Sequence, residues 1–477
     1  MNAAVLLRQK VLDLAIRGKL TKREKGDEPA SALLARIVAE KEKRNAKVGR
    51  ARTSAVPQPI PDDEKPFELP NGWVWAKLGE LGIWKAGGTP SRSHSEYYRN
   101  GDIPWLKTGD LNDGFISDIP EKITKRGLES TSARVNAPGS VLMAMYGATI
   151  GKLGILAIPA ATNQACCACD LLNCAEPEYL FYYLMAQRHA FIQLGGGGAQ
   201  ANISKEIIVN YQVPVPPVGE QRRIVARIKE LLAAIDKYSA AMGKISNAAD
   251  MLEKKVLDLA IRGKLTKREK GDGAAAEIIE KIAVARARRV AQKLMRKEKA
   301  LPPITPDEQS FDLPEGWAWA RLGQLVQLTS GQDLTPNRYN DNKKGIPYLT
   351  GASNIQDGNV IINRWTQTPT SCAEKGDLLF TCKGTVGRMA VLNEKKVHIA
   401  RQIMGLRAWG GINLTYIQYC LTTMVAGLQS IARSMIPGIG RDDLLNKVIP
   451  LPPLAEQDRI VERVGAILAE CRKMRGE

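Results

Sequence analysis

One 18-residue stretch, KVLDLAIRGKLTKREKGD, occurs twice in this chain without a single difference, at Lys10–Asp27 and at Lys255–Asp272. The spacing is about half of the chain, which indicates a duplicated unit. Further matching stretches follow each copy in the same order: LPNGWVWAKLGEL with LPEGWAWARLGQL, GDIPWLKTGDL with KGIPYLTGASNI, PGSVLMAMYGATIGKLGIL with KGDLLFTCKGTVGRMAVL, and VPVPPVGEQRRIVARIKELL with IPLPPLAEQDRIVERVGAIL. Elsewhere the halves differ almost completely, so we expect a common frame that carries two divergent surfaces.

A long helix is expected after each of the proline-rich VPVPP and IPLPP stretches. After Ile224 the apolar residues recur in alternating steps of four and three, which is typical of a coiled-coil seam. At about 1.5 Å per residue this helix would be roughly 55–65 Å long. The matching helix after Glu456 is cut short at Glu477, and Met1 aligns with Ser246. We therefore expect the N-terminus to supply what the C-terminus lacks, so that both chain ends build the second long helix.

The predicted coiled-coil and partner interface consists of the apolar residues on these seams. They are Ile224, Ile228, Leu231, Ile235, Leu252, Val256 and Leu259 on the central helix, Leu7, Val11 and Leu14 near the N-terminus, and Ile460, Val464 and Ile467 near the C-terminus. A basic helical stretch follows each long helix, from Glu28 and from Ala274. Its Lys and Arg side chains either form the solvated face of a helix that packs on its neighbour or contact phosphates.

Pro-rich hinges and the repeat together divide the chain into five regions. The first is an N-terminal helical region, 1–56, which completes the distal coiled-coil helix and adds a basic helix. The others are a first domain at 57–217, a central helical region at 218–300, a second domain at 301–453 and a C-terminal coiled-coil helix at 454–477. Short β-type runs among Gly, Pro and Asn turns indicate that each domain is a compact α+β unit. The predicted fold class is α+β, with two similar domains in a pseudo-two-fold repeat, separated by two long antiparallel coiled-coil helices.

The composition favours a soluble chain with a polyanionic partner. The formal charge is +18, from 68 Lys and Arg against 50 Asp and Glu, and such an excess favours nucleic acid. No apolar run reaches the roughly 18 residues of a membrane span. Charges interrupt the N-terminal apolar residues, so we expect a mature cytoplasmic N-terminus without a signal peptide. The cluster ACCACDLLNC has no second CxxC pair or nearby His, so we expect a buried strand and no metal site.

Catalytic motifs are not found in the sequence. GATIGK is two residues too short between its glycines for a phosphate loop and lacks the following Ser or Thr, so it is expected to form a turn between paired strands. No motif of an amino-methyltransferase is found, and no Ser/His/Asp or Cys/His arrangement. We therefore expect a non-catalytic chain that contains no cofactor.

The repeated LPxGWxWxxLGxL, PxPPxxEQ and LDLAIRGKL patterns resemble those of the specificity subunit of type I restriction-modification enzymes, over essentially the whole chain. The resemblance implies two target-recognition domains, each of which reads one half of a bipartite, asymmetric site in double-stranded DNA. It implies that the long helices bind two modification (methyltransferase) subunits, which carry S-adenosylmethionine. Restriction (motor-nuclease) subunits, which use ATP and Mg²⁺ for cleavage, would complete the complex. Two alternatives stay open at this point: a self-sufficient DNA adenine methyltransferase, and a coiled-coil scaffold that does not bind DNA.

Predicted DNA contacts are Lys, Arg and polar side chains near Gly-rich loops, because Lys and Arg neutralise phosphates and Arg, Lys, Gln and Asn read base edges. In the first domain they are Lys85, Ser91, Arg92, Lys107, Lys152, Gln200 and Lys205, and in the second they are Gln332, Arg338, Tyr339, Lys383, Arg388, Arg401 and Arg441. The Trp residues of the shared frame, Trp73, Trp75, Trp317 and Trp319, are expected to be core anchors. Arg17, Gly18, Arg262 and Gly263, at the helix ends, could contact a partner subunit.

Overall fold

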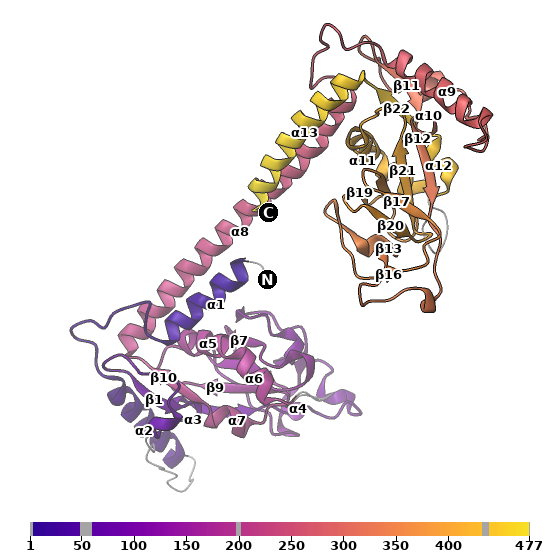
Figure 1. Ribbon diagram of the computed structural model, residues 1–477. Helices are drawn as coiled ribbons and strands as arrows, with labels where there is room; N and C mark the ends of the chain where they lie inside the picture. The colour runs from indigo at the N-terminus through magenta and orange to yellow at the C-terminus, as the bar shows by residue number, and fades with distance from the viewer. Residues whose placement is uncertain (1–2, 48–59, 197–201, 432–437, 477) are drawn as a thin grey trace. The chain divides into compact units, whose positions relative to one another are not determined.

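The computed structural model describes residues 3–47, 60–196, 202–431 and 438–476. The chain forms two compact units, Met1–Ala241 and Met242–Glu477 (Figure 1). The helix α8 (Val218–Ile261) is continuous through the boundary and contributes its first part to unit 1 and its last part to unit 2. Each unit is a mixture of sheets and helices with its own apolar core.

Unit 1 starts with the helices α1 (Ala3–Ile16) and α2 (Ala30–Lys47), and an α+β domain follows them. The domain helices are α3 (Leu78–Leu81), α4 (Lys125–Glu129), α5 (Pro177–Ala186), α6 (Arg188–Leu194) and α7 (Lys205–Asn210). The strands are β1 (Val74–Lys77), β2 (Ile83–Ala86), β3 (Ile103–Leu106), β4 (Phe115–Ile116), β5 (Lys122–Ile123), β6 (Val141–Ala144), β7 (Leu153–Leu156), β8 (Ala161–Thr162), β9 (Cys166–Asp170) and β10 (Gln212–Val215).

Three sheets organise the domain of unit 1. The central sheet has the order β2-β9-β6-β7-β4, an outer sheet has the order β5-β3-β8, and β1 pairs with β10 next to the start of α8. The strand β9 holds Cys166, Cys167 and Cys169, which are all buried, so the prediction of a buried strand is confirmed. Burial raises the pKa of the Cys167 thiol to about 12, so this group stays protonated at neutral pH.

Unit 2 repeats this plan after the last part of α8. Its helices are α9 (Ala275–Ala291), α10 (Leu322–Leu325), α11 (Leu414–Ile431), α12 (Arg441–Leu445) and α13 (Leu454–Arg475). Its strands are β11 (Ala318–Arg321), β12 (Val326–Ser330), β13 (Ile346–Leu349), β14 (Ile355–Gln356), β15 (Asn359–Val360), β16 (Trp365–Thr366), β17 (Cys372–Glu374), β18 (Leu378–Thr381), β19 (Met389–Val391), β20 (Lys396–Ile399), β21 (Ile403–Ala408) and β22 (Val448–Leu451). The sheets have the orders β12-β21-β18-β19, β16-β13-β20-β17, β11-β22 and β14-β15.

The registers show that the two domains are equivalent. Val74 pairs with Val215 in unit 1, and Ala318 pairs with Leu451 in unit 2. The outer sheets agree as well: β3 runs parallel to β8, and β13 runs parallel to β20. The predicted turn at GATIGK is confirmed, because it joins the antiparallel pair β6 and β7.

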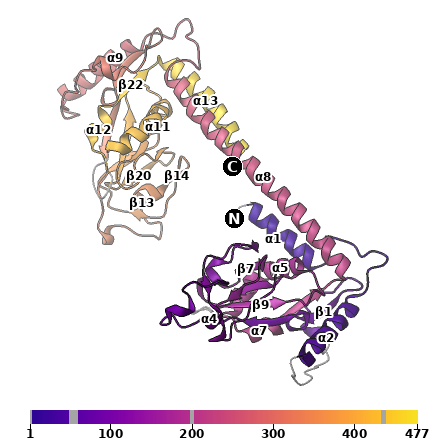
Figure 2. The same ribbon diagram turned by 180° about the vertical axis from the view of Figure 1, so that it is seen from behind.

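In each unit a second helix packs against α8 in the antiparallel sense. In unit 1, Ala4 and Val11 of α1 share a core cluster with Ile228 and Ile235, and α1 also contacts α5 (Figures 1 and 2). In unit 2, Ile460 and Val464 of α13 share a cluster with Val256 of α8. Arg8 of α1 pairs with Asp236 and Thr21, after α1, bonds to Glu220, while the Arg475 guanidinium of α13 lies 2.5 Å from Glu253 and Glu456 of α13 bonds to Thr266. In both units the residue numbers rise along one helix as they fall along the other, so each pair is antiparallel. The predicted α+β fold with a repeated domain and antiparallel long helices is confirmed.

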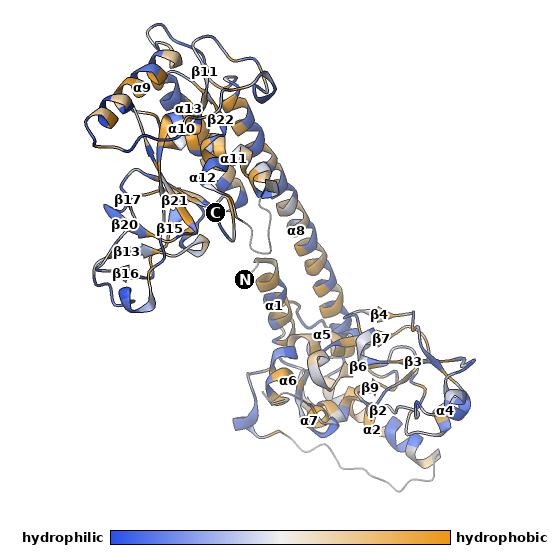
Figure 3. Cartoon of the chain, turned by 90° about the vertical axis from the view of Figure 1, so that its right-hand side faces the viewer, coloured by the Kyte–Doolittle hydropathy of each residue, from blue (hydrophilic) through white to orange (hydrophobic). Residues whose placement is uncertain are grey.

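Burial along the helix seams follows a seven-residue step. Ile228, Ile235, Ala249 and Val256 are buried on α8. The other predicted seam positions vary: Ile224, Val11, Ile460 and Val464 are buried, Leu231, Leu259, Leu14 and Ile467 are half-buried, and Leu7 and Leu252 are 45% and 42% exposed. Figure 3 shows that α1 is predominantly hydrophobic around its circumference. None of the helices in the described ranges has the length and the hydropathy that crossing a membrane requires.

Candidate nucleic-acid interface

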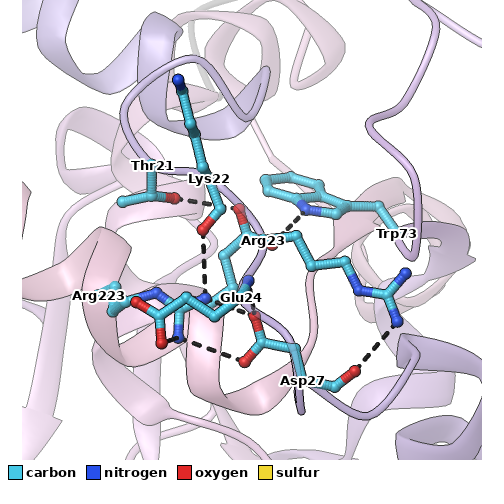
Figure 4. A network of polar contacts seen from close by, with 8 residues as sticks. Thr21, Lys22, Arg23, Glu24, Asp27, Trp73 and Arg223 are labelled. Atoms are coloured by element: carbon cyan, nitrogen blue, oxygen red, sulfur yellow. Dashed lines mark hydrogen bonds and ion pairs between the residues drawn. The ribbon is translucent and has the colours of Figure 1, made fainter.

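A buried carboxylate joins the domain to the long helix in each unit. Glu220, in the first turn of α8, accepts hydrogen bonds from Trp73 Nε1 at 3.0 Å and from Thr21 Oγ1 at 3.1 Å. Figure 4 labels the two donors, Trp73 and Thr21. The Glu220 carboxylate therefore links the start of α8 to Trp73, which directly precedes β1, and to Thr21 of the repeated stretch. We call this set of contacts the joint of unit 1. The glutamate side chain is almost fully buried, so its two donors replace the water that it loses.

The joint of unit 2 has the same chemistry. Glu456, in the first turn of α13, accepts from Trp317 Nε1 at 2.9 Å and from Thr266 Oγ1 at 3.0 Å. Trp73 and Trp317 are 6% and 8% exposed, which confirms that they are core anchors. Trp75 and Trp319 are half-buried and pack against Phe67 and Phe311 with ring centroids 4.9 Å apart.

The glutamine that follows each glutamate completes the PxPPxxEQ motif. Gln221 donates to the Pro216 carbonyl at 2.9 Å and accepts from the Glu176 backbone N–H at 3.0 Å. Gln457 donates to the Pro452 carbonyl at 2.9 Å and accepts from the Asn413 N–H at 2.9 Å. Each glutamine therefore ties the start of a long helix to the start of a domain helix, α5 or α11. The sequence showed this motif twice but not this role.

An arginine one turn further along each helix binds the end of the repeated stretch. Arg223 lies 3.2 Å and 2.5 Å from the two carboxylate oxygens of Asp27 (Figure 4), and Arg459 lies 3.0 Å and 2.6 Å from those of Asp272. The hydrogen bond from arginine holds the pKa of Asp27 and of Asp272 below its usual range. Both aspartates are mostly buried. The aspartate that ends each KREKGD segment is therefore held in the same way in both units.

The Arg-Gly pairs at the helix ends contact the chain's own domains. Gly18 has φ +64°, and a Cβ atom there would lie 2.4 Å from Pro70 Cγ. Gly263 has φ +63° and would meet Pro314 Cγ at 2.3 Å. Both conditions require glycine, which ends the helix in the left-handed region. The Arg17 and Arg262 guanidinium carbons lie 4.9 and 4.8 Å from the ring centroids of Phe67 and Phe311. These residues therefore pack beside the joints of their own units. Their contact with a partner subunit stays a prediction.

Cations of the basic helices α2 and α9 hold these helices against the domains. Lys41 Nζ donates to the carbonyls of Gly79 and Glu80 at 2.7 and 3.0 Å, and Arg286 donates to those of Gly323 and Gln324 at 2.6 and 3.2 Å. These are the last carbonyls of the short helices α3 and α10, where a cation complements the helix dipole. Burial lowers the pKa of Lys41. Of the two hypotheses for these helices, packing on a neighbour accounts for these two cations.

The predicted DNA contacts of unit 1 lie on several elements: Lys85 on β2, Ser91 and Arg92 in the loop after β2, Lys107 directly after β3, Lys152 in the β6–β7 turn and Lys205 at the start of α7. Glu121 pairs with Arg92 at 2.5 Å and with Lys107 at 2.7 Å, and the hydrogen bond from Arg92 lowers the pKa of Glu121. The Arg92 guanidinium also lies over the rings of Tyr98 and Trp105. The structure therefore brings Arg92 and Lys107 together. Lys85, Ser91, Lys152 and Lys205 are exposed, and Gln200 lies outside the described residues.

Three of the arginines predicted in unit 2 brace loops. Arg388 donates to the carbonyls of Ala352 and Ile355 at 2.9 and 3.1 Å. Arg338 Nε donates to Thr368 Oγ1 at 3.0 Å, and Arg441 donates to the Leu328 carbonyl and Ser330 Oγ at 3.1 Å. The remaining members are exposed or half-buried: Gln332, Lys383 and Arg401 are exposed, and Tyr339 is half-buried with its ring centroid 5.5 Å from that of Tyr348.

Backbone hydrogen bonds place two of the predicted cations at equivalent positions. The Ala144 N–H donates to the Lys152 carbonyl, and the Thr381 N–H donates to the Arg388 carbonyl, both at 2.9 Å. Lys205 and Arg441 each open a short helix, α7 or α12, before the last strand of their domain. No cluster of three or more His, Cys, Asp or Glu side chains that could hold a metal ion occurs in the described part of the chain. The exposed side chains are of the kinds that contact phosphates and base edges in protein–DNA complexes, and their role as DNA contacts stays a prediction.

Comparisons with known proteins agree with this geometry. The family model of the type I restriction modification DNA specificity domain matches residues 70–240 and 314–473. The specificity subunit of the Escherichia coli type I restriction enzyme EcoEI is 25% identical, over 98% of this chain and 90% of that protein. The EcoAI specificity subunit, also from Escherichia coli, is 22% identical over the same shares of both chains.

Solved structures share the fold. A chain from a structure of complex assembly and conformational transition in a type I R-M system matches with a TM-score of 0.64 at 22% identity, over 86% of this chain and 93% of that chain. The HsdS subunit from Thermoanaerobacter tengcongensis matches with a TM-score of 0.54 at 24% identity, with the same coverage. Two matched domains over most of the sequence, on a frame that the joints repeat, show that the chain belongs to the type I restriction modification DNA specificity family.

Proposed function

We propose that this chain is the DNA-recognition subunit of a type I restriction-modification enzyme and that each domain reads one half of a bipartite, asymmetric site. The observation that carries this proposal is the contrast within the repeat. The joints are the same in both units, whereas the loops that present exposed cations differ in sequence. Two similar domains with unlike surfaces fit two unlike half-sites, because half-site arrangement mirrors the symmetry of the protein that reads it.

Charge supports DNA as the ligand. The excess of 18 positive charges suits a polyanion, and exposed Lys85, Lys152, Lys205 and Lys383 are suited to phosphates. In this role the chain binds the target DNA sequence and catalyses no reaction. It would bind DNA in the cytoplasm. It would contain no cofactor of its own. S-adenosylmethionine would belong to two modification subunits, and ATP and Mg²⁺ to restriction subunits.

Exposed apolar side chains on the long helices support binding of the modification subunits. Val5, Leu6 and Leu7 of α1 are 44–50% exposed, and Met251 and Leu252 of α8 are 73% and 42% exposed. Neighbouring apolar residues that remain exposed on a helix are typical of protein interfaces. These residues would contact helices of the modification subunits.

Methylation mapping tests this function. The chain is expressed with its modification subunits in a host that lacks other adenine methyltransferases, and methylated adenines are sequenced across the genome. A motif of two specified halves around an unspecified gap is expected. A single continuous motif, or methylation by this chain alone with S-adenosylmethionine, would contradict the proposal. Binding of the purified complex to the motif should also weaken steeply as salt increases.

A further inference from the structure

In each domain, two loops meet at the edge where the outer sheet joins the central sheet. In unit 1 they are residues 87–90, after β2, and residues 162–165, from the last residue of β8 to the start of β9. In unit 2 they are residues 331–334, after β12, and residues 399–402, from the last residue of β20 to the start of β21. We call each pair of loops the loop junction of its unit. The Gly87 N–H donates to the Cys166 carbonyl at 3.2 Å, and the Gly331 N–H donates to the Ile403 carbonyl at 3.1 Å.

Close contact of the two backbones makes each junction rigid. A Cβ atom on Gly87 would lie 2.0 Å from the Thr162 carbonyl oxygen, and one on Gly331 would lie 2.0 Å from the Ala400 carbonyl oxygen. Only glycine allows the loops to approach this closely. The next residues bond across the junction as well, because the Gly88 and Gln332 N–H groups each donate at 2.9 Å to the carbonyls of Thr162 and Ile399.

A buried ring supports each junction from the core side. In unit 1, Trp105 Nε1 donates to the Gly88 carbonyl at 3.0 Å. In unit 2, His398 Nε2 lies 2.9 Å from the Gln332 carbonyl, while His398 Nδ1 accepts from the Thr370 and Ser371 N–H groups at 3.3 and 3.2 Å. These acceptor contacts assign the proton to Nε2. Trp105 and His398 are 1% and 0% exposed, so different side chains provide the same support.

On the solvent side, one exposed residue from each loop forms a pair. In unit 1, Thr89 hydrogen bonds to Gln164. In unit 2, Asp333 Oδ2 lies 2.7 Å from Arg401 Nε, and Asp333 Oδ1 accepts from the Arg401 N–H at 3.1 Å. With the Gln402 amide nitrogen turned toward it, Gln402 also donates to Asp333 Oδ1 at 3.2 Å. The two pairs have the same position and different chemistry.

We propose that Gln164 and Arg401 are the base-reading residues of the two domains, with Thr89 and Asp333 as positioning residues. This inference rests on the proposed DNA-recognition function and assigns its specificity. In the major groove, a Gln side chain pairs with the N6 and N7 of adenine, and Arg pairs with the O6 and N7 of guanine. Unit 1 is therefore expected to specify an adenine, and unit 2 a guanine, at the base pair that each junction faces.

Arg401 is distinguished from the other three arginines that are predicted to contact DNA in unit 2 by the group that holds it. Arg338, Arg388 and Arg441 donate to backbone carbonyls of their own domain. Arg401 is fixed at Nε by a carboxylate, and its side chain stays 65% exposed. A guanidinium that is oriented at one edge and exposed at the other is suited to a bidentate contact. In unit 1, Arg92 is fixed by Glu121 and by two aromatic rings, which leaves Gln164 as the equivalent exposed reader.

Two substitutions, one in each unit, test the inference with the complete methyltransferase complex. Arg401→Gln should change the methylated motif at one position of one half, and Gln164→Ala should relax one position of the other half. Discrimination at the affected position should decrease about 10- to 100-fold, the range for one bidentate pair. Lys395→Gln is the matched control, because it removes one exposed charge just before β20, at the end opposite to the junction. It should leave the motif unchanged.

A binding measurement covers the case in which a variant complex methylates too little DNA to map. Competition at low salt, between the wild-type site and duplexes changed at single positions, measures discrimination even for weakly bound DNA. Unchanged discrimination at every position in both variants would overturn the inference, as would changes of both variants in the same half. If the wild-type complex shows no bipartite motif, the proposed function fails. If the motif is present and unaffected by both substitutions, only the assignment of Gln164 and Arg401 fails.

Discussion

Between unit 1 and unit 2 the joints keep the same side chains, whereas the loop junctions keep the same backbone but change their side chains. At the joints, side-chain identity and distance are both retained: the Trp to Glu hydrogen bonds measure 3.0 and 2.9 Å, and the Thr to Glu hydrogen bonds measure 3.1 and 3.0 Å. At the junctions the backbone is retained, but Thr89 and Gln164 in unit 1 are replaced by Asp333 and Arg401 in unit 2. Identical side chains mark where a domain is attached, and identical backbone with changed side chains marks where the two domains are specialised.

The largest effect is expected from a charge in the helix seam. Ile228 and Val464 occupy equivalent positions and are 1% and 0% exposed. Ile228→Asp should lower the free energy of unfolding of unit 1 by more than about 3 kcal/mol, because it removes a buried side chain and buries an unpaired carboxylate. Val464→Asp should do the same to unit 2. Hydrogen exchange resolved by peptide measures each unit separately.

Met251→Asp is the control for the seam, since Met251 is on the same long helix and 73% exposed. It should change the stability of the free chain by less than about 0.5 kcal/mol. If Ile228→Asp leaves exchange in α1 unchanged, the two helices are not stabilised by this seam. Leu231→Asp should have a smaller effect than Ile228→Asp, because Leu231 is only half-buried.

An intermediate effect is expected at the joints. Glu220→Ala leaves the buried Trp73 indole N–H without an acceptor and should cost about 1–3 kcal/mol, and Glu456→Ala should have the same effect on Trp317. Urea unfolding gives the free energies, and faster exchange of the indole N–H in each variant reports the lost hydrogen bond. Glu230→Ala, which removes an exposed partner of Arg227, should change stability by less than about 1 kcal/mol. A difference between the two joint variants above about 1 kcal/mol would break their equivalence.

The smallest effect is a pH dependence confined to unit 2. Burial lowers the pKa of His398, and the equivalent strand position in unit 1 holds Ala161. The unfolded chain then binds a proton more readily than the folded unit. Stability from this group is therefore complete above the unfolded pKa of about 6.5 and is lost as the pH falls toward the folded value. Protection factors of the β13 and β20 amides at pH 7.5 and 5.5, which correct for the pH dependence of intrinsic amide exchange, measure it, and His398→Asn should remove the difference. The same pH dependence in that variant would assign it to other groups.

The sequence predicted the frame that the two domains share because the same stretches occur in both halves of the chain. The repeated stretches predicted two similar domains and the antiparallel long helices, and the alternating steps of four and three predicted that Ile228 and Val464 lie on the seams. The role of Glu220 as a buried acceptor was not predicted, because its donors Thr21 and Trp73 lie 199 and 147 residues away along the chain. Only the fold brings these three side chains together.

The surroundings of the predicted DNA contacts were harder to infer than the frame, because their partners lie elsewhere along the chain. Arg92 and Lys107 were chosen for their charge, but their shared partner Glu121 could not be inferred, because only the fold brings it next to both side chains. Arg401 was predicted, whereas Asp333, 68 residues away along the chain, was not. Thr89 and Gln164 carry no charge, and the only signal that marks them is their alignment with an ion pair in unit 2.

Both joints are formed at the ends of α8 and α13, and no joint contact involves the middle of α8 around Gly243. An insertion of seven residues there would keep the apolar seam in phase on both sides and leave Glu220 and Thr266 with their partners. An insertion of five residues would rotate the two halves of the seam out of phase. Selection can therefore lengthen or shorten this helix in steps of one heptad without any compensating change in either domain.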